Sequence, residues 1–336
     1  MTPLDPQAAP SQSREPRDAN VPGEAPRPAL VRTRAELEAA LAVRPAAAGK
    51  AYRRAVVMTM GALHPGHLSL VARARELADQ VVVSIFVNPL QFGPGEDLAQ
   101  YPRDLAGDLD LLATVGADLV FAPTADVMFP GGETVVRVSA GELGEILEGV
   151  TRPGHLDGVL TVVLKLLHLT RPDVSVFGQK DAQQVMAVER MVRDLDVPVR
   201  IVAVPTVRDA DGLALSSRNA FLAPAERERA LVLSRALRAG EQALRAREDR
   251  RESDGGNDDS SGGGGDADAV RAAAAAVLAG ADVELDYLAL VDPRTAREVP
   301  SGHRGAAVLA VAARVGVTRL IDNVPLRLGE HGEVPA

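Results

Sequence analysis

The sequence predicts an α/β fold, in which a Rossmann-like, mainly parallel sheet precedes a smaller α+β C-terminal domain with a short antiparallel sheet. Between residues 54 and 205, short apolar runs rich in β-branched residues alternate with segments of helical periodicity. This alternation is typical of a parallel sheet covered by helices on both faces. After residue 206 it stops, and short adjacent apolar runs close the chain, which favours a small antiparallel sheet.

The first half of the chain supplies the elements of the parallel sheet. Thr33 and Glu36 form a capping-box pattern, which predicts a helix at 33–43. A buried strand runs from residue 54 to Gly61, and a tight turn leads into a helix that starts at about Gly66. The other expected elements are strands at 81–87, 118–122, 135–138, 174–178 and 199–205 and helices at 104–115, 158–170 and 181–195.

Residues 207–336 are expected to form the smaller C-terminal lid domain, and 29–206 the nucleotide-binding domain. Pro224 opens a long predicted helix, and residues 249–265 are rich in Asp, Gly and Ser, which predicts a flexible acidic insertion. Residues 1–28 hold seven prolines, so we expect a disordered N-terminal tail there. The remaining predicted elements are helices at 224–247 and 268–279 and strands at 283–291, 307–315 and 318–322.

Composition and charge exclude several classes of protein. The net charge is −9 and aromatic residues make up 3% of the chain, whereas nucleic-acid-binding surfaces are basic and often stack bases on aromatic rings. Cysteine is absent, which excludes disulfides and thiolate chemistry. The chain also lacks a signal-peptide core and an uncharged apolar run of about 20 residues. We therefore expect a cytoplasmic protein that binds neither nucleic acid nor membranes.

The strand-to-helix turn at residues 60–67 carries two histidines, His64 and His67. Unpaired backbone N–H groups at a helix start favour an anion, and two imidazoles beside them can donate hydrogen bonds to phosphate oxygens. The alternative is structural, because histidines often cap helices or pack near helix ends. The position of this turn after a buried strand favours a nucleotide phosphate site.

Two further segments carry candidate phosphate ligands. Lysine occurs only at Lys50, Lys165 and Lys180, and Lys180 follows a predicted strand, where its ammonium suits a phosphate. Alternatively, Asp181 is an N-cap and Lys180 a solvated charge. Residues 215–218, Leu-Ser-Ser-Arg, offer hydroxyls and a guanidinium for the outer phosphates of a triphosphate, or they form an ordinary turn.

Six segments in this order resemble the pantothenate synthetase (pantoate–β-alanine ligase) family of the His-x-Gly-His nucleotidyltransferase superfamily. The resemblance covers about residues 30–325, and a His-x-Gly-His turn alone would mark only the superfamily. The matching segments are TMGALHPGH (59–67), VSIFVNPLQF (83–92), YPR (101–103), RPGH (152–155), FGQKD (177–181) and DGLALSSRN (211–219).

The resemblance implies ATP-dependent condensation of (R)-pantoate with β-alanine through a pantoyl adenylate, with release of AMP and pyrophosphate. It implies a homodimer, Mg²⁺ with unknown ligands, and His67 as a proton donor, with His64 and Lys180 also catalytic. Gln91 would contact both organic substrates and Gln184 pantoate, while Asn88, Arg152 and His155 are weaker candidates. The residues implied in ATP binding are Met60, Gly61, Ala62, Leu63, His64, Pro65, Gly66, His67, Gly178, Gln179, Lys180, Asp181, Val207, Leu215, Ser216, Ser217 and Arg218.

Four residues depart from the family pattern, namely Met58, Pro65, Gln179 and Ala182. Each departure retains the expected phosphate donors, so it bears on affinity more than on the reaction. Two other functions compete with the ligase interpretation. One is another nucleotidyltransferase of the superfamily, and the other is a non-catalytic nucleotide-binding subunit.

Overall fold

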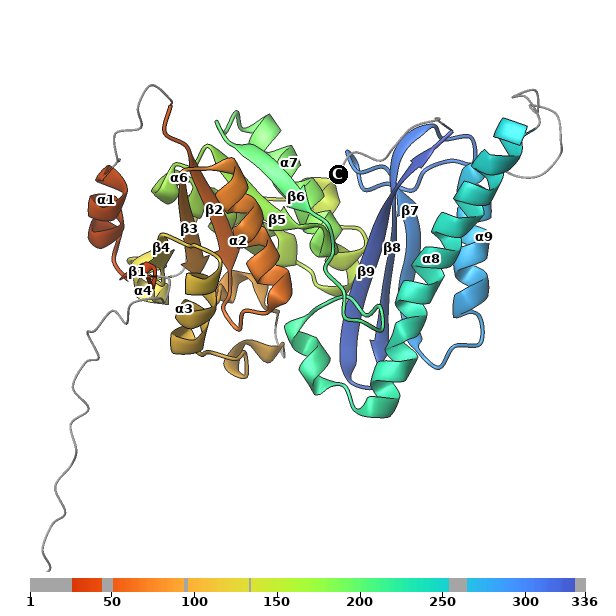
Figure 1. The fold of residues 1–336 in the computed structure, drawn as a ribbon, viewed down its shortest axis with the longest axis horizontal. Helices are drawn as coiled ribbons and strands as arrows, with labels where there is room; N and C mark the ends of the chain where they lie inside the picture. Colours follow the sequence, from red (N-terminus) through yellow and green to blue (C-terminus); the bar gives the residue numbers. More distant parts are fainter. Residues whose placement is uncertain (1–25, 44–50, 94–95, 133, 254–264, 330–336) are drawn as a thin grey trace, which may run out of the picture.

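The computed structural model describes residues 26–43, 51–93, 96–132, 134–253 and 265–329. Most of the predicted N-terminal tail, at 1–25, and most of the predicted insertion, at 254–264, lie outside these residues. Figure 1 shows two layered halves side by side, with helices α2 and α7 on the parallel sheet and helices α8 and α9 on the antiparallel sheet. The predicted fold class is confirmed.

Within the described residues, six parallel strands form the first sheet in the order β1-β4-β3-β2-β5-β6. The central strands are almost fully buried, because β-branched side chains on both faces pack under helices. The strands are β1 (Ala29–Val31), β2 (Arg54–Thr59), β3 (Gln80–Ile85), β4 (Leu119–Phe121), β5 (Val174–Gly178) and β6 (Arg200–Val204). Strand β1 was not expected from the sequence, because it is only three residues long.

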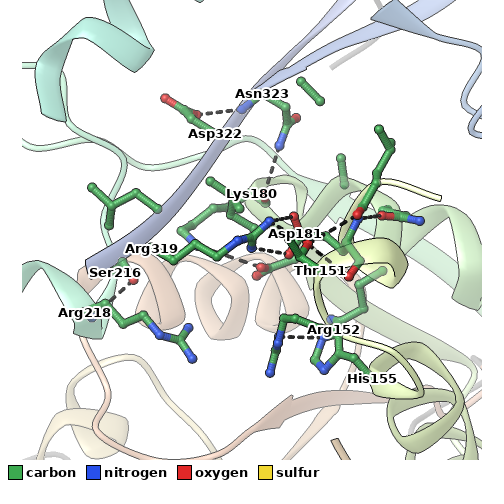
Figure 2. Close-up of a pocket in the computed structure, with 18 of the residues that line it drawn as sticks. Thr151, Arg152, His155, Lys180, Asp181, Ser216, Arg218, Arg319, Asp322 and Asn323 are labelled. Carbon is green, nitrogen blue, oxygen red and sulfur yellow. Dashed lines mark hydrogen bonds and ion pairs between the residues drawn. The ribbon is translucent and has the colours of Figure 1, made fainter. Parts of the chain in front are cut away.

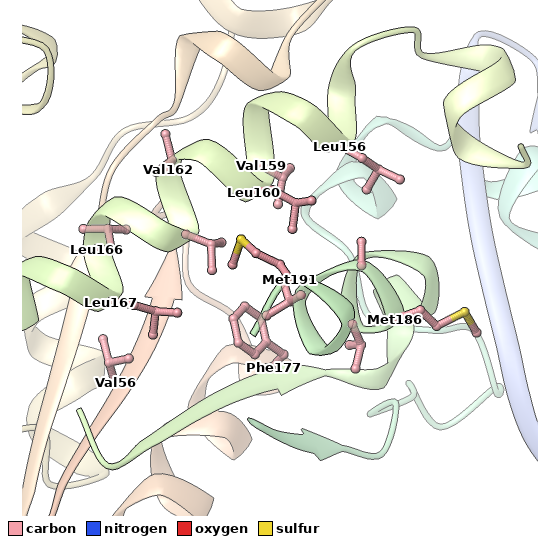
Figure 3. Close-up of a cluster of buried hydrophobic side chains, with 14 of the residues drawn as sticks. Val56, Leu156, Val159, Leu160, Val162, Leu166, Leu167, Phe177, Met186 and Met191 are labelled. Carbon is pink, nitrogen blue, oxygen red and sulfur yellow. The ribbon is translucent and has the colours of Figure 1, made fainter. Parts of the chain in front are cut away.

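Successive strand residues face opposite layers, so Val56 and Val57 of β2 enter different cores. One core contains apolar residues of α2 (Pro65–Leu77) and α3 (Leu105–Thr114). The other contains residues of α1 (Arg34–Ala42), α6 (His155–Thr170) and α7 (Ala182–Asp194). Figure 3 shows Phe177 and Met191 between α6 and α7 in this second core. Ten of the sixteen residues of α6 are buried, as expected for a helix that is apolar almost all round.

Three described strands form the antiparallel sheet in the order β7-β8-β9, namely β7 (Glu284–Val291), β8 (Gly305–Val315) and β9 (Thr318–Leu328). One face packs under α8 (Pro224–Ser253) and α9 (Asp266–Leu278). Residues of the other face, including Val291 and Ala310, join the core of α6 and α7. The two sheets therefore share an apolar contact.

A mostly buried ion-pair network also joins the two halves. Arg319 of β9 donates to both carboxylate oxygens of Glu148, at 2.6 and 2.8 Å, and to Asp286 at 2.6 Å. Tyr287 donates its hydroxyl hydrogen to Glu148 at 2.8 Å. Burial opposes the charge of Arg319, yet the hydrogen bonds and negative charge of Glu148 raise the pKa of Arg319 above its ordinary value. The network fixes β9 against α5 (Glu148–Thr151).

Three predictions are corrected, namely one strand and two helix boundaries. Residues 135–138 form no strand, and Val135 and Val136 are 98% and 86% exposed, since no neighbouring strand pairs with them among the described residues. Helix α6 begins at His155 rather than 158, because Gly154 adopts a left-handed conformation there. Helix α8 continues to Ser253, where Arg251 donates to the buried Asp266 at 2.7 Å. Residues 249–253 of the predicted flexible insertion are therefore helical.

We expect Glu148→Ala to lower the free energy of unfolding by about 3–5 kcal/mol, because it leaves the mostly buried guanidinium of Arg319 without its bidentate partner. Urea denaturation followed by circular dichroism measures the change. Glu142→Ala is the matched control, since it removes an exposed carboxylate from its ion pair with Arg297 and should cost only about 0–1 kcal/mol. Equal shifts of the denaturation midpoint in both variants would contradict this prediction.

Candidate functional site

The turn after β2 is fixed by a buried carboxylate. Gly61 and Ala62 both have positive φ angles, of 86° and 52°, and a Cβ added at Gly61 would lie 3.0 Å from Oδ2 of Asp108. That carboxylate accepts hydrogen bonds from the N–H groups of Ala62 at 3.2 Å and Leu63 at 2.8 Å. Burial raises the pKa of Asp108, and the two N–H donors oppose that rise. The turn therefore has little freedom to move.

His64 and His67 lie side by side at the start of α2, with ring centroids 4.0 Å apart. Nδ1 of His64 accepts from the N–H of Gly66 at 3.2 Å, and Nδ1 of His67 accepts from the N–H of His64 at 3.4 Å. A neutral imidazole that accepts at Nδ1 carries its hydrogen on Nε2. The helix start therefore sets both rings as Nε2–H donors.

Both histidines have lowered pKa values. Burial, followed by the charge of His64, lowers the pKa of His67 from 6.5 to about 3. Burial is also the largest cause for His64, and the positive charge of Lys180 lowers its pKa further. Both rings are therefore neutral near pH 7 and offer hydrogen bonds rather than charge. A phosphate anion bound beside them would raise both pKa values, because it favours the charged form.

Lys180 reaches the same space from the end of β5. The 3₁₀ turn Gln179–Asp181 follows this strand, and Nζ of Lys180 lies 3.8 Å from Oδ1 of Asp181. A cavity of about 200 Å³ is lined by His64, His67 and Lys180 together. The carboxyl ends of β2 and β5 meet at one edge of the parallel sheet, which is where ligands bind in such sheets.

Residues 207–218, which we call the strap, follow β6 and border this cavity. Arg208 pairs with Ala214 in an antiparallel bridge, and the N–H of Leu215 donates to the carbonyl of Val207 at 2.9 Å. Oγ of Ser216 accepts from the N–H of Arg218 at 3.2 Å and caps a 3₁₀ helix. The strap thus brings the Leu-Ser-Ser-Arg segment to the cavity wall.

The candidate substrate residues form the opposite wall. Gln91 accepts from Nδ2 of the buried Asn88 at 3.0 Å, which orients its amide. Its backbone carbonyl accepts from Nδ1 of His155 at 2.8 Å and from Arg152 at 3.2 Å. Arg152 also donates to both carboxylate oxygens of Glu96, at 2.9 and 2.6 Å. This hydrogen bonding with Arg152 lowers the pKa of Glu96.

The small cavity adjoins a larger one of about 930 Å³ between the two sheets. Figure 2 shows Arg152, His155, Lys180, Ser216 and Arg218 around this space. Six predicted residues do not line the small cavity, namely Gly61, Ala62, Leu63, Pro65, Asn88 and Gln179. The predicted residues that line it are Met60, His64, Gly66, His67, Gln91, Arg152, His155, Gly178, Lys180, Asp181, Gln184, Val207, Leu215, Ser216, Ser217 and Arg218.

A protein-family model described as pantoate-beta-alanine ligase matches residues 29–325. The chain belongs to this family. Pantothenate synthetase from Streptomyces avermitilis is 55% identical over 311 residues, which span 82% of this chain and 93% of that protein. Pantothenate synthetase from Streptomyces coelicolor is 53% identical over 343 residues, which span 91% and 97%.

Solved structures agree with this assignment. A crystal structure of pantothenate synthetase from Thermus thermophilus matches with a TM-score of 0.74 at 46% identity, covering 88% of this chain and 98% of that one. Pantoate-beta-alanine ligase from Francisella tularensis, in complex with beta-gamma ATP and beta-alanine, matches with a TM-score of 0.66 at 32% identity, covering 88% and 97%. The predicted family is confirmed, and the chain is an ATP-using ligase that condenses pantoate with β-alanine.

Sequence reasoning missed several residues that shape the site of this ligase. Asp108 and Glu96 were not singled out, because an acidic residue on a predicted helix or loop usually faces solvent. Asp322 and Asn323 lie in or beside a predicted strand and are only 3% and 4% exposed. Two adjacent polar residues directly after Leu320 and Ile321, at the end of an expected strand, were the available signal.

We expect the imidazole of His67 to titrate with a midpoint near pH 3 in the free ligase, because burial lowers its pKa to about 3. Nitrogen-15 NMR of the ring measures the midpoint, and His67→Gln identifies the resonance. Since the unfolded chain binds the proton more tightly between pH 6.5 and about 3, the free energy of unfolding falls as pH falls through this range. His67→Gln should flatten that fall, whereas a midpoint near 6.5 would contradict the prediction.

Proposed function

We propose that the ligation takes place in the small and the larger cavity, which together we call the cleft, in two half-reactions on one bound nucleotide. In the first, a carboxylate oxygen of pantoate attacks the α-phosphorus of ATP, the bond to the β-phosphate bridging oxygen breaks, and pyrophosphate leaves. Because the carboxylate is already an anion, this step needs positioning and positive charge on the leaving group rather than a base. The convergence of His64, His67 and Lys180 on one cavity carries this proposal.

Each wall of the cleft has a proposed role. The Nε2–H groups of His64 and His67 and the ammonium of Lys180 donate to the triphosphate, and Ser216, Ser217 and Arg218 bind it from the strap. Gln91 and Gln184 hold pantoate on the other side of the reacting phosphorus. The remaining predicted ATP residues shape the backbone at these places, namely Met60, Gly61, Ala62, Leu63, Pro65, Gly66, Gly178, Gln179, Asp181, Val207 and Leu215.

His67 donates as a neutral ring in the free enzyme, since its pKa lies at about 3. The negative charge of bound ATP raises this pKa and increases the ability of Nε2–H to share its proton with a phosphate oxygen. A role as proton donor therefore depends on the nucleotide being present. In the free enzyme, burial keeps the ring uncharged, so it does not repel the ammonium of Lys180.

In the second half-reaction, the uncharged amine of β-alanine attacks the acyl carbon of the pantoyl adenylate. The bond between that carbon and the phosphate oxygen breaks, AMP leaves and the amine loses a proton. The larger cavity beside the nucleotide site gives β-alanine access, and Arg152 and His155 line both cavities. Arg152 is a candidate partner for the carboxylate of β-alanine, provided that it exchanges Glu96 for this substrate.

We propose that Mg²⁺ enters the site together with ATP, bound to its phosphate oxygens. Among the residues that the structure describes, no group of three or more His, Asp or Glu side chains could hold a metal ion. Within this part of the chain the side chains therefore form no metal cage of their own, and the steps above use only the side chains named. When bound, the ion would neutralise phosphate charge.

Residues 207–336 are proposed to act as a lid on the nucleotide-binding domain at 29–206. The strap and β9 both belong to the lid, and both border the cleft. Closure of such a lid would exclude water from the adenylate. The ion-pair network between Glu148 and Arg319 lies at the boundary of the two domains and is a candidate pivot.

We expect Lys180→Ala and His67→Ala to slow adenylate formation by about 10²–10³-fold, because each removes a donor to the departing pyrophosphate. Exchange of labelled pyrophosphate into ATP in the presence of pantoate measures this step, and β-alanine is added afterwards. Lys165→Ala is the matched control, since Lys165 lies on α6 with its ammonium 5.0 Å from the ring centroid of Phe129. Exchange that proceeds without pantoate would contradict the proposed order of steps.

The ligase is further proposed to be a cytoplasmic homodimer, as the family resemblance suggests. No helix within the described residues is long and apolar enough to cross a membrane. Val135 and Val136 expose their side chains almost completely and are candidates for the contact between subunits. We expect Val136→Asp to reduce the dimer fraction in sedimentation velocity, whereas Val317→Asp, in the exposed turn between β8 and β9, should not. Equal dimer fractions would place the contact elsewhere.

A further inference from the structure

Two adjacent residues of β9 hold two different segments of the cleft. Asp322 and Asn323 are buried, and they pair with Val311 and Ala310 of β8, so β9 presents them on opposite faces. Strand β9 is the edge strand that borders the cleft. Each of the two side chains contacts a segment that carries proposed phosphate ligands.

Asn323 holds the 3₁₀ turn Gln179–Asp181, which we call the Lys180 turn, through its side-chain amide. Nδ2 of Asn323 donates to the backbone carbonyls of Gln179 and Lys180, both at 2.9 Å. Because a carbonyl can only accept, the two contacts fix which end of the amide carries the hydrogens. Nε2 of Gln179 donates back to Oδ1 of Asn323 at 3.4 Å. These bonds cross from the antiparallel sheet to the end of a central strand of the parallel sheet (Figure 2).

Asp322 holds the strap through Arg208. The two guanidinium nitrogens of Arg208 donate to the two carboxylate oxygens of Asp322, at 2.6 and 2.9 Å. Arg208 also donates to the carbonyl of Gly212 at 3.2 Å, which closes the hairpin that leads to Ser216. The backbone N–H of Asn323 donates to Oδ1 of Asp322 at 2.8 Å. This bond connects the hydrogen bonds that hold the strap with those that hold the Lys180 turn.

We propose that Asn323 is a positioning residue for Lys180 and that, together with Asp322, it sets the distance between Lys180 and the strap. Because the two side chains occupy neighbouring positions of one strand, the same strand fixes residues 179–181 and the strap relative to each other. Lys180 is therefore aligned with the departing pyrophosphate only while these hydrogen bonds hold. This inference rests on the proposed role of Lys180 in the first half-reaction.

The test compares the two half-reactions in Asn323→Ala. Rapid-quench measurement of pyrophosphate release with ATP and pantoate follows the first, and addition of β-alanine to enzyme loaded with synthetic pantoyl adenylate follows the second. We expect the first to slow by roughly 10–100-fold, because a displaced Lys180 is poorly aligned, and the second to stay within about threefold of the unmodified enzyme. A general loss of folding would slow both.

Tyr287→Phe is the matched control. It removes one hydrogen bond, at 2.8 Å to Glu148, between the same antiparallel sheet and the first domain, and it leaves the hydrogen bonds of residues 179–181 and of the strap in place. It should leave the ratio of the two half-reaction rates unchanged. The same change of ratio in Tyr287→Phe and Asn323→Ala would overturn the inference, since any weakened contact between the halves would then suffice.

A double-mutant cycle separates this inference from the proposed function. If Asn323 acts through Lys180, adding Asn323→Ala to Lys180→Ala should slow the first half-reaction no further. A full additional slowing would overturn the inference and leave the proposed function standing. A normal first half-reaction in Lys180→Ala alone would contradict the proposed function, and this inference with it.

Asn323→Asp is a second variant of almost the same shape, for use where Asn323→Ala is unstable. It places a carboxylate oxygen where the amide nitrogen donates, opposite two carbonyl acceptors, and should slow the first half-reaction selectively. Because protonation restores a donor, the loss should ease as pH falls. A first half-reaction as fast as in the unmodified enzyme at every pH would overturn the inference.

Discussion

The site depends on how the backbone N–H groups at the end of β2 are satisfied. Backbone donors beyond the last ladder pair of a strand have no partner within the sheet, and unsatisfied buried donors are costly. Here Asp108 accepts from Ala62 and Leu63, and the histidine rings accept from the next residues of the turn. This pairing leaves the hydrogen of each ring on Nε2, so the same bonds that complete the fold at this edge also prepare the surface that we propose to bind phosphate.

Charge in the cleft is arranged by burial as much as by residue type. Burial keeps both histidines neutral, with a further contribution from His64 to the lowered pKa of His67 and from Lys180 to the lowered pKa of His64. The free enzyme therefore does not accumulate positive charge that it cannot solvate. Arg152, by contrast, is held by Glu96, and its charge is compensated before any substrate arrives. Binding an anion would change both situations, because it would raise the histidine pKa values and compete with Glu96 for Arg152.

Three kinds of contact join the two halves of the molecule. Apolar residues of β7 and β8 complete the core of α6 and α7, Arg319 pairs with Glu148, and Asn323 donates to the Lys180 turn. Apolar contacts tolerate small sliding, whereas bidentate ion pairs and buried hydrogen bonds require one geometry. The polar contacts therefore select the orientation in which the strap and the Lys180 turn face each other.

The sequence by itself determined the fold class, the family and most of the cavity lining, because strand-to-helix turns, apolar periodicity and six ordered motifs are local signals. It failed where the outcome depended on distant partners. Residues 135–138 are rich in valine, as strands are, but have no described neighbour to pair with, and three-residue β1 exists only because β4 lies beside it. Likewise, only the tertiary structure showed that Asp108, Asp322 and Asn323 hold the site, since the groups that satisfy a buried polar side chain lie far away along the chain.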